Sequence, residues 1–381
     1  MADFTFVQQV KVITGRGSFS KIGSLIAECG YRKVFIVTTS GMVRRGTVGK
    51  LQEQLQAHSI ASVVYDAVTP DPSAELIDAG ADLCKANACD CVLAIGGGSC
   101  LDAAKGINIL RFNDGKILDY TTKPIQTCHN LIVVPTTSGT GSELSNGSIV
   151  SDTKNHVKLP IGCADCMPEY AILDPELTVS MPKKVTIDTG LDVFSHAFEA
   201  YTAVTSNPMT DVICEAVMET VVQYLPLACA HPDDLDAREK MQSAAAIAGW
   251  MLYNCAAHVG HSYAHVIGAH FQIAHGEACA CGLPSVVKVI AGAVPAKIKR
   301  VGQILGVCFT GDESAAEIAQ KTANAYQAFV HELGLAIHLP EICDAEADQL
   351  AEMIVQEAFA GLAPVKITKE CAMTLVTDSL K

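Results

Sequence analysis

Imidazole side chains gather in one segment that has no fixed charge. Between Lys240 and Glu277 the chain contains no Asp, Glu, Lys or Arg, yet five of its 12 histidines lie there. These five are His258, His261, His265, His270 and His275. A stretch that excludes charge and concentrates imidazole is more typical of a cation site than of a solvated surface. The sequence therefore predicts a buried metal site.

Two pairs of potential ligands are spaced four residues apart, and a helix places such pairs on one face. His261 and His265 form one pair, and His275 follows ten residues later in a short helix-to-loop stretch. Asp192 and His196, in GLDVFSHAFEAY, form the second pair. One carboxylate with several imidazoles suits iron or zinc, whereas calcium and magnesium prefer oxygen ligands. A single pair of this kind is usually structural or accidental, so the prediction depends on the combination.

Composition limits the classes of function. The length of 381 residues suits two domains, and 49% hydrophobic residues provide a large core. The net charge of −14 and the lack of a basic patch argue against a nucleic-acid partner. The N-terminus lacks the pattern of a secretory signal, so we expect the 16 cysteines to be reduced and the protein to be cytoplasmic. The uncharged segment contains histidines and glycines, which favours a buried segment over a membrane span.

The order of the chain predicts a change of architecture near residue 182. Residues 1–182 alternate β-branched runs with helical patterns, which predicts an α/β dinucleotide-binding domain with a mostly parallel sheet. Residues 183–381 show long helical patterns and almost no strand signal, which predicts an all-α metal- and substrate-binding domain. The Asp-rich segment His231 to Lys240 is interpreted as a solvated loop between two helices. The expected strands are Val34 to Thr38, Ser62 to Asp66, Cys91 to Ile95 and Leu131 to Pro135.

Two loops in the α/β half could bind a dinucleotide. The first joins a buried strand to a helix through Gly96, Gly97, Gly98 and Ser99. Backbone amides at a helix start can bind a diphosphate, and glycine allows close approach, although such a turn is also a common tight connection. The second loop follows another buried strand and has hydroxyl groups on Thr136, Thr137, Thr140 and Ser142. Loops after neighbouring parallel strands share one sheet edge, so these two predict a nucleotide site outside the usual fingerprints.

Five separated motifs in this order give a specific resemblance. They are GGGSCLDAAK (96–105), PTTSGTGSE (135–143), AILDPELT (171–178), GLDVFSHAFEAY (190–201) and the His261, His265 and His275 set. Together the motifs resemble the iron-containing, or group III, alcohol dehydrogenases from about residue 5 to the C-terminus. The resemblance implies a Rossmann-like N-terminal domain, an all-α C-terminal domain and a cleft between them. It also implies NAD(P)-dependent oxidation of alcohols or reduction of aldehydes.

The resemblance also implies roles for single residues. The family's metal ligands fall on Asp192, His196, His261 and His275. His265 falls where the family has a histidine beside substrate and nicotinamide, so it is the candidate for proton relay or substrate positioning. The family's cofactor contacts fall on Gly97, Gly98, Ser99, Asp102, Thr136, Thr137, Thr140 and Lys158. A divalent ion, iron or zinc, would lower the pKa of a bound alcohol, and the resulting alkoxide would release hydride to the nicotinamide.

The chain departs from the family pattern at two places. Many members have an Asp that accepts hydrogen bonds from the adenosine ribose, and that position is Thr39 here, with Arg44 and Arg45 close by. The carboxylate that would repel a 2′-phosphate is missing, so we expect NADP to be used beside NAD. His258 stands where glycine is common. It is either a hydrogen-bonded core histidine or a polar substrate contact.

The resulting hypothesis is a cytoplasmic, metal-dependent dehydrogenase for a small primary alcohol, diol or aldehyde. We expect no nucleic-acid or membrane partner and a homo-oligomer, a dimer or higher. One alternative is a glycerol dehydrogenase-like enzyme that uses zinc on a polyol. Another is a catalytically silent assembly subunit, which the presence of all four potential ligands argues against.

Overall fold

The computed structural model describes residues 4–155, 157–335, 339 and 342–379. The chain forms two compact units. The sheet unit consists of Gln8–Thr137 and Gly141–Ser180. The helical unit consists of Met1–Val7, Ser138–Thr140 and Met181–Lys381, within the described ranges. The assignment of one function to residues 1–182 and another to 183–381 stays a prediction.

The sheet unit is built on a parallel sheet, as the sequence predicts. Its six described strands run in the order β1-β8-β5-β4-β2-β3, and every neighbouring pair is parallel. A separate antiparallel hairpin joins β6 to β7. Both β4 and β5 are buried at every residue, as expected for central strands covered on two faces. The strands are β1 (Lys11–Thr14), β2 (Lys33–Val37), β3 (Ala61–Tyr65), β4 (Cys91–Gly96), β5 (Leu131–Pro135), β6 (Gly147–Asp152), β7 (Val157–Gly162) and β8 (Tyr170–Leu173).

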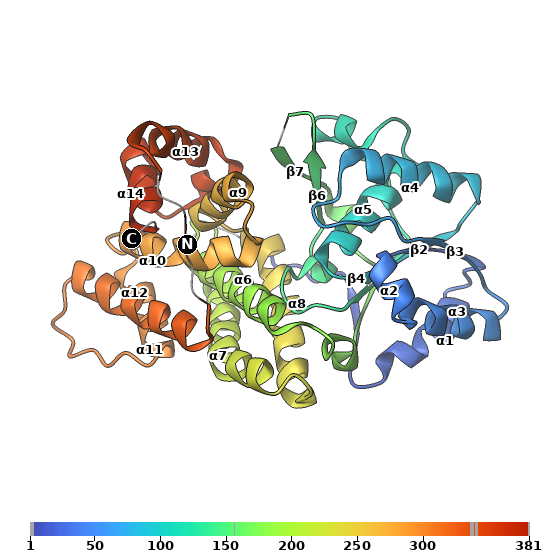
Figure 1. The fold of residues 1–381 in the computed structure, drawn as a ribbon, viewed down its shortest axis with the longest axis horizontal. Coiled ribbons are helices and arrows are strands. Elements are labelled where there is room, and N and C mark those ends of the chain that lie inside the picture. The colour runs from blue at the N-terminus through green and yellow to red at the C-terminus, as the bar shows by residue number, and fades with distance from the viewer. Residues whose placement is uncertain (1–3, 156, 336–338, 340–341, 380–381) are drawn as a thin grey trace. The chain divides into compact units, whose positions relative to one another are not determined.

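Helices cover both faces of this sheet. Figure 1 shows α4 and α5 on one side of β2 and β3, and α1 and α3 on the other. The α-helices of the unit are α1 (Ile22–Glu28), α2 (Ser40–Arg44), α3 (Thr47–Ala57), α4 (Ala74–Ala86) and α5 (Gly98–Phe112). Short 3-10 helices are η1 (Ser18–Lys21), η2 (Ile117–Thr121), η3 (Ser142–Leu144), η4 (Ala164–Cys166) and η5 (Pro175–Thr178). The predicted α/β class with a mostly parallel sheet is confirmed.

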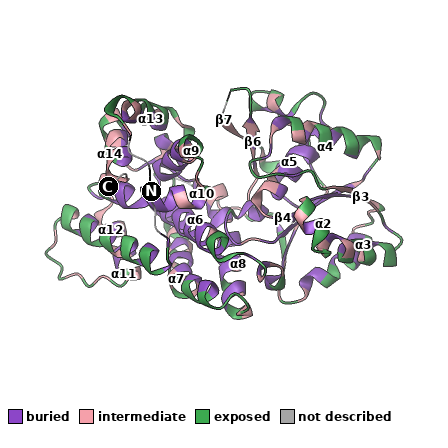
Figure 2. Ribbon diagram, viewed as in Figure 1, coloured by how far each residue is buried: buried purple, intermediate pink, exposed green. Residues whose placement is uncertain are grey.

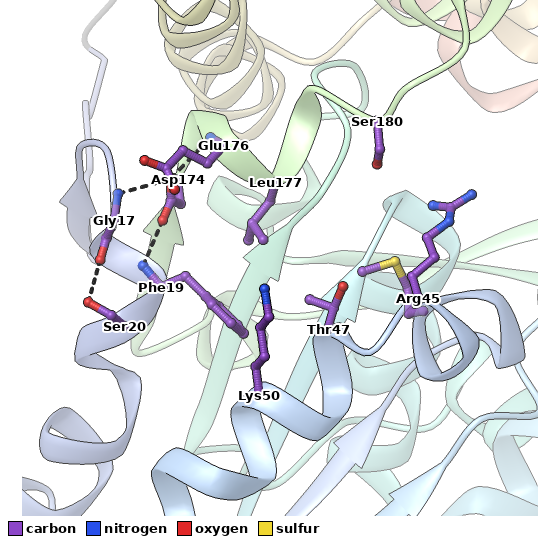
Figure 3. Close-up of a pocket in the computed structure, with 11 residues that line it drawn as sticks. Gly17, Phe19, Ser20, Arg45, Thr47, Lys50, Asp174, Glu176, Leu177 and Ser180 are labelled. Carbon is purple, nitrogen blue, oxygen red and sulfur yellow. Dashed lines mark hydrogen bonds between the residues drawn. The ribbon is translucent and has the colours of Figure 1, made fainter. Parts of the chain in front are cut away.

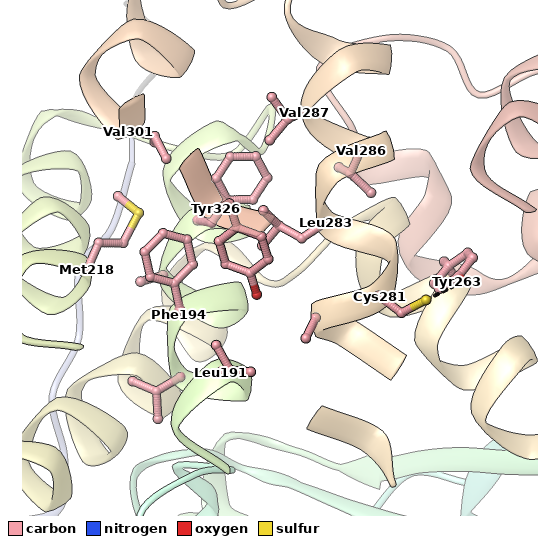
Figure 4. Close-up of a cluster of buried hydrophobic side chains, with 14 of the residues drawn as sticks. Leu191, Phe194, Met218, Tyr263, Cys281, Leu283, Val286, Val287, Val301 and Tyr326 are labelled. Carbon is pink, nitrogen blue, oxygen red and sulfur yellow. Dashed lines mark hydrogen bonds between the residues drawn. The ribbon is translucent and has the colours of Figure 1, made fainter. Parts of the chain in front are cut away.

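The helical unit surrounds one apolar core. Figure 2 shows α6 as buried along most of its length, and Figure 4 shows Phe194, Tyr326 and Leu283 meeting in that core. The helices are α6 (Lys183–Thr202), α7 (Pro208–Ala230), α8 (Leu235–Cys255), α9 (Val259–Phe271), α10 (His275–Ile290), α11 (Pro295–Ile304), α12 (Ala315–Glu332), α13 (Asp344–Gln356), η6 (Ala358–Leu362) and α14 (Lys369–Ser379). The predicted helical C-terminal half is confirmed.

One helix of this unit is long and apolar enough to cross a membrane. It is α7, and the criterion is only length and composition. Core helices of soluble proteins meet the same criterion, so the evidence for a span is weak. In the helical unit α7 packs against α6 and α8.

The interpretation of His231 to Lys240 as one loop is wrong beyond residue 234. The α8 helix begins at Leu235, because Asp234 Oδ1 accepts hydrogen bonds from the amides of Asp236 and Ala237 and caps it. Arg238 is buried in that helix and donates from its guanidinium to Thr186 Oγ1 at 3.0 Å. The acidic run was therefore a helix start as well as a loop signal.

Candidate functional site

The buried helix α6 presents three polar side chains on one face. Asp192, His196 and Glu199 are spaced by four and three residues and are 3%, 4% and 2% exposed. The His196 Nε2 atom lies 3.3 Å from Asp192 Oδ1. Polar groups in a dry core must find partners, because their desolvation otherwise costs free energy. These three side chains therefore need hydrogen-bonding or metal partners from other elements of the fold.

Helices α9 and α10 bring further potential ligands to Asp192. His261 Nε2 lies 3.8 Å from Asp192 Oδ1, and His275 Nε2 lies 3.6 Å from the same oxygen. His275 is the first residue of α10, not part of the expected loop, and Cys279 lies one turn later. Each of Asp192, His261, His275 and Cys279 offers a ligand atom, and these atoms all lie within 4.8 Å of one another. The four residues are called the donor cluster below.

The donor cluster fits a metal ion because one of its buried nitrogen atoms has no hydrogen-bond partner among the described residues. Within the described part of the chain, His261 Nε2 is buried and has no hydrogen-bond partner. His196 is not one of the four cluster residues, although its Nε2 lies near Asp192; its Nδ1 is also buried without a hydrogen-bond partner among the described residues. Buried imidazole nitrogens are rarely left without a partner, and such cases call for an explanation such as an ion or a water. A borderline divalent ion accepts nitrogen, oxygen and sulfur donors of this kind.

Glu199 fixes the orientation of His261. Its Oε1 lies 2.6 Å from His261 Nδ1, and its Oε2 accepts hydrogen bonds from the amides of His258 and His261 at 2.7 and 3.1 Å. With Nδ1 directed at the carboxylate, Nε2 faces the donor cluster, which is the arrangement common in metal sites. Gly260 makes room for it, since a Cβ there would lie 2.5 Å from Glu199 Oε1. Burial opposes the charge of Glu199, but His261 and His258 lower its pKa to about 2.

Burial controls the protonation of the imidazoles. It holds the pKa of His196 and of His275 well below the ordinary value. Burial acts the same way on His261, but the Glu199 carboxylate outweighs it and raises the pKa of His261. Neutral imidazole is the form that binds a metal, so His196 and His275 are already in that form near neutral pH.

His265 lies next to the donor cluster but outside it. Its ring is stacked on His275 with centroids 5.4 Å apart, and its centroid is 6.2 Å from that of His261. Its Nδ1 lies 2.9 Å from Glu357 Oε1, and its side chain is 20% exposed. A partly exposed histidine held by a carboxylate suits proton transfer better than metal binding.

The other two histidines of the uncharged segment have partners elsewhere. His258 is fully buried, and its Nε2 lies 2.8 Å from Thr202 Oγ1. This position agrees with the core interpretation of His258 and gives no access to a substrate. His270 is at the surface, where its Nε2 lies 2.7 Å from Glu346 Oε1.

In the sheet unit, the two expected cofactor loops follow neighbouring strands. After β4, Gly97 caps α5, and Gly98 and Ser99 lie in the first turn of that helix. Thr136 and Thr137 directly follow β5. The loops are joined by a hydrogen bond from the Thr136 amide to the Gly96 carbonyl, at 2.9 Å. A Cβ on Gly97 would lie 3.2 Å from Thr137 Cγ2, a tight contact, so the two loops approach each other closely here. Thr140 belongs to the helical unit.

The other expected cofactor residues of the sheet unit have protein partners. Asp102 Oδ1 accepts a hydrogen bond from Ser142 Oγ at 2.6 Å, and the buried Lys105 Nζ donates to the same hydroxyl at 2.8 Å. Burial raises the pKa of Asp102 and lowers that of Lys105 to about 8. Lys158 Nζ forms an ion pair with Asp71 Oδ1 at 2.7 Å. A cofactor that uses Lys158 must compete with this pair.

Thr39 caps α2, whose Met42 lines a pocket of about 300 Å³. Its Oγ1 accepts a hydrogen bond from the Met42 amide and caps α2. Figure 3 shows the pocket, which is lined by Met42, Arg45, Lys50 and residues that follow β1 and β8. Among the described residues, the side chains of Arg45 and Lys50 form no ion pair. The pocket thus contains two cations, Arg45 and Lys50, together with the carboxylates of Asp174 and Glu176.

Comparison with known proteins decides the family. Residues 9–175 match the iron-containing alcohol dehydrogenase family, and residues 186–380 match the C-terminal part of Fe-containing alcohol dehydrogenases. The chain belongs to the iron-containing alcohol dehydrogenase family. The expected family, and with it the class of metal-dependent oxidoreductase acting on alcohols, is confirmed.

Relatives of this alcohol dehydrogenase are similar along most of the chain. It is 31% identical over 359 residues to the NAD-dependent methanol dehydrogenase of Bacillus methanolicus, with 93% of this chain and 92% of that protein covered. It is 32% identical over 364 residues to a 1-propanol dehydrogenase of Citrobacter freundii, with 94% of each covered. A crystal structure of a 1,3-propanediol oxidoreductase has a TM-score of 0.93 at 27% identity and covers 99% of this chain and 100% of its own.

The structure adds three residues to the candidate site: Glu199 and Glu357, which the sequence analysis missed, and Cys279, which was set aside because the sequence shows no second matched cysteine pair. Glu199 was within the quoted motif, and its spacing of three residues from His196 is a helical signal that could have found it. Cys279 has the same kind of signal, four residues after His275. Glu357 comes from a distant segment next to η6, and nothing in the local sequence indicates its contact with His265.

Proposed function

We propose that this protein transfers hydride between NAD(P) and a small primary alcohol, diol or aldehyde. In this proposal Asp192, His196, His261 and His275 hold a divalent metal, iron or zinc. The single observation that carries the proposal concerns His261 Nε2. This atom is buried and has no hydrogen-bond partner in the described part of the chain, yet it lies within 4.8 Å of the other three donors of the cluster. A divalent ion there would supply Lewis acidity to a substrate oxygen.

The residues around the donor cluster divide the remaining work. Glu199 holds His261 in one tautomer, with the proton on Nδ1 and a free Nε2. Glu357 accepts a hydrogen bond from His265 Nδ1 in the same way, which leaves His265 Nε2 to take a proton from the substrate hydroxyl. In the reverse direction the same nitrogen returns the proton. His265 is therefore proposed as the catalytic acid and base.

The dinucleotide is proposed to bind in the loops at the carboxyl ends of β4 and β5. Gly97, Gly98 and Ser99 would give the diphosphate backbone amides at the start of α5. The other proposed contacts are Asp102, Thr136, Thr137, Thr140 and Lys158. Both NAD and NADP are proposed as cofactors, because position 39 has a threonine and so lacks the carboxylate that would repel a 2′-phosphate.

Assembly and location are proposals as well. We propose a homo-oligomer, a dimer or higher, in the cytoplasm. Apolar side chains that a second copy could cover support the first part, since Val204, Met209 and Val212 are 60%, 48% and 71% exposed. Among the described residues all cysteines are free, which supports a reducing compartment. Sedimentation velocity on the purified chain would measure the oligomeric state.

Steady-state kinetics on defined metal forms would test the activity. The chain is stripped with a chelator and loaded anaerobically with iron or zinc. Each form is then assayed with NAD and NADP over short alcohols, diols and aldehydes. We expect activity only in metal-loaded protein, with small primary alcohols or diols and their aldehydes as the best substrates. Highest efficiency on glycerol with zinc would favour the polyol alternative, and no turnover with any pair would favour a silent subunit.

A further inference from the structure

We propose that the Cys279 sulfur is a further ligand of the metal, beside Asp192, His261 and His275. This inference rests on the proposed function, because it takes the metal site as given. It goes beyond that function by adding a sulfur donor to a set of carboxylate and imidazole ligands.

Helix α10 directs Cys279 to the same point as His275. The two residues are four apart, so they share a helix face. Gly276 holds this helix start close to α6, since a Cβ there would lie 1.9 Å from the Asp188 carbonyl oxygen. Cys279 is 2% exposed, so its thiol faces the interior and not solvent. The fold thus fixes the sulfur beside the other donors.

The distances match those between ligands of one ion. Cys279 Sγ lies 3.7 Å from Asp192 Oδ1 and 3.6 Å from His275 Nε2. Metal–sulfur bonds of about 2.3 Å and metal–oxygen or metal–nitrogen bonds of about 2.0 Å, at tetrahedral angles, separate such atoms by about 3.5 Å. Asp192 Oδ1 lies 3.8 Å from His261 Nε2 and 3.6 Å from His275 Nε2, somewhat longer than the roughly 3.3 Å between two such donors of a tetrahedral ion.

An independent observation shows that the cluster is open to an ion. His261 Nε2 is buried and, in the described chain, has no hydrogen-bond partner, although it lies within 4.8 Å of the Cys279 sulfur. A thiol hydrogen bond to Asp192 does not remove this demand. An ion placed among the four atoms satisfies all of them at once. On binding, the S–H bond breaks, its proton goes to solvent, and a sulfur–metal bond forms without any change of oxidation state.

A sulfur ligand has consequences for metal choice. Thiolate is a soft donor that favours zinc and cobalt over magnesium or manganese. Together with His196, the cluster has five potential donors, so a four-coordinate ion cannot keep them all and also bind substrate. A six-coordinate ion such as iron retains one open position with all five bound. The balance between sulfur and substrate oxygen would then depend on which metal is loaded.

Cobalt spectroscopy on the full-length protein tests the assignment. The chain is stripped, loaded with one equivalent of cobalt(II), and its bound cobalt is counted after dialysis. We expect a near-ultraviolet sulfur-to-cobalt charge-transfer band in the wild type. The band should disappear in Cys279→Ser and remain in Cys281→Ser. Cys281 is the matched control because it lies on the same helix and is buried, but its sulfur contacts Tyr263.

A second measurement needs no variant. X-ray absorption on the zinc-loaded wild type should show a sulfur scatterer at about 2.3 Å beside nitrogen and oxygen at about 2.0 to 2.1 Å. Zinc competition should show that Cys279→Ser, relative to Cys281→Ser, loses more than the roughly 10- to 100-fold in affinity that follows removal of an outer partner. This absorption measurement decides the question even if Cys279→Ser does not fold.

The outcomes separate this inference from the proposed function. One bound cobalt with no sulfur band, or a band that persists in Cys279→Ser, overturns the role of Cys279 and leaves the metal site intact. A zinc spectrum with only nitrogen and oxygen neighbours does the same. If wild-type protein binds neither cobalt nor zinc, both the sulfur ligand and the proposed metal site are wrong.

Discussion

The donor cluster of the helical unit and the loops of the sheet unit are prepared for their ligands in different ways. In the cluster, the His261 Nε2 atom is buried and, among described residues, lacks a partner. In the sheet unit, Asp102 and Lys158 are already bonded to Ser142 and Asp71. The donor cluster therefore has a buried nitrogen that only a ligand can satisfy. The side chains of the sheet unit must instead give up their protein partners to bind a ligand. Under the proposed function, we therefore expect tight, permanent binding at the first site and reversible binding at the second.

The largest expected effect is the loss of the metal. His275→Ala should abolish tight metal binding, because it removes a ligand in a buried site. The loss should exceed the roughly 10- to 100-fold seen when only an outer partner of a ligand is removed. Elemental analysis after dialysis measures it. His270→Ala, a change at an exposed histidine paired with Glu346, is the control. Unchanged metal content in His275→Ala would contradict the ligand assignment and the comparison with it.

A second prediction separates binding from proton transfer inside the helical unit. His265→Ala should keep the metal but lower turnover by about 100- to 10,000-fold, the usual range for general acid and base help. Glu357→Gln should have a smaller effect, since it keeps the imidazole and changes only its partner. Metal content and kcat are measured on the same preparations. Loss of metal in step with loss of activity would make His265 a ligand instead.

The third prediction concerns a buried carboxyl group of the sheet unit. Glu143 is 2% exposed, and burial raises its pKa to about 7, although Lys105 opposes this. The folded state then binds the proton more tightly than the unfolded state. The resulting stability is present below about pH 4.5 and is lost as the pH rises through 7. Glu143→Gln should therefore stabilise the protein by up to about 3 kcal/mol at pH 8, and little at pH 4.5.

Urea denaturation at the two pH values would measure this difference. The control is Glu53→Gln, a change at an exposed glutamate of α3 in the same unit. Its effect should not depend on pH. Equal effects of Glu143→Gln at both pH values would show that the carboxyl group is not perturbed as described. A stabilising loss of charge would sharpen the comparison, because the sheet unit would then also hold unmet polar demand.

The smallest expected effect is on cofactor choice. Thr39→Asp should selectively impair NADPH by about 1 to 3 kcal/mol, roughly 5- to 150-fold, because a carboxylate repels the 2′-phosphate in a part-solvated site. Thr39→Asn is the matched control, since it can also cap α2 but has no charge. The ratio of kcat/KM for NADH and NADPH measures the effect. If Thr39→Asp leaves this ratio unchanged, cofactor choice is set at another position.

Periodicity predicted the elements with strong local signals and missed those without them. The buried runs of β4 and β5 and the long apolar helices were found because their patterns extend over several residues. Strands β1 and β8 have only four residues each, and β1 is not buried, so neither gives a clear alternation. The two strands pair with each other although most of the sequence of the sheet unit lies between them, and no local pattern indicates such a tertiary contact.

The site shows the same division. The spacing of residues within α6 and α9 was enough to predict Asp192, His196 and His261 as candidate ligands. The meeting of α6 with α10, and of Glu357 with His265, depends on packing between distant segments. Cys279 was considered as a metal ligand together with Cys281 and set aside, because the sequence shows no second matched cysteine pair with zinc-site spacing. Only the distances to Asp192 and His275 show that this thiol differs from the others.

The donor cluster draws its atoms from α6 and from the consecutive helices α9 and α10, which lie more than 50 residues further along the chain. An ion bound there would act as a clamp across the core of the helical unit. Releasing it would free three helices at once, so metal-free protein should open more often and be degraded sooner by cellular proteases. The supply of metal would then set the amount of this protein in the cell as well as the activity of each molecule.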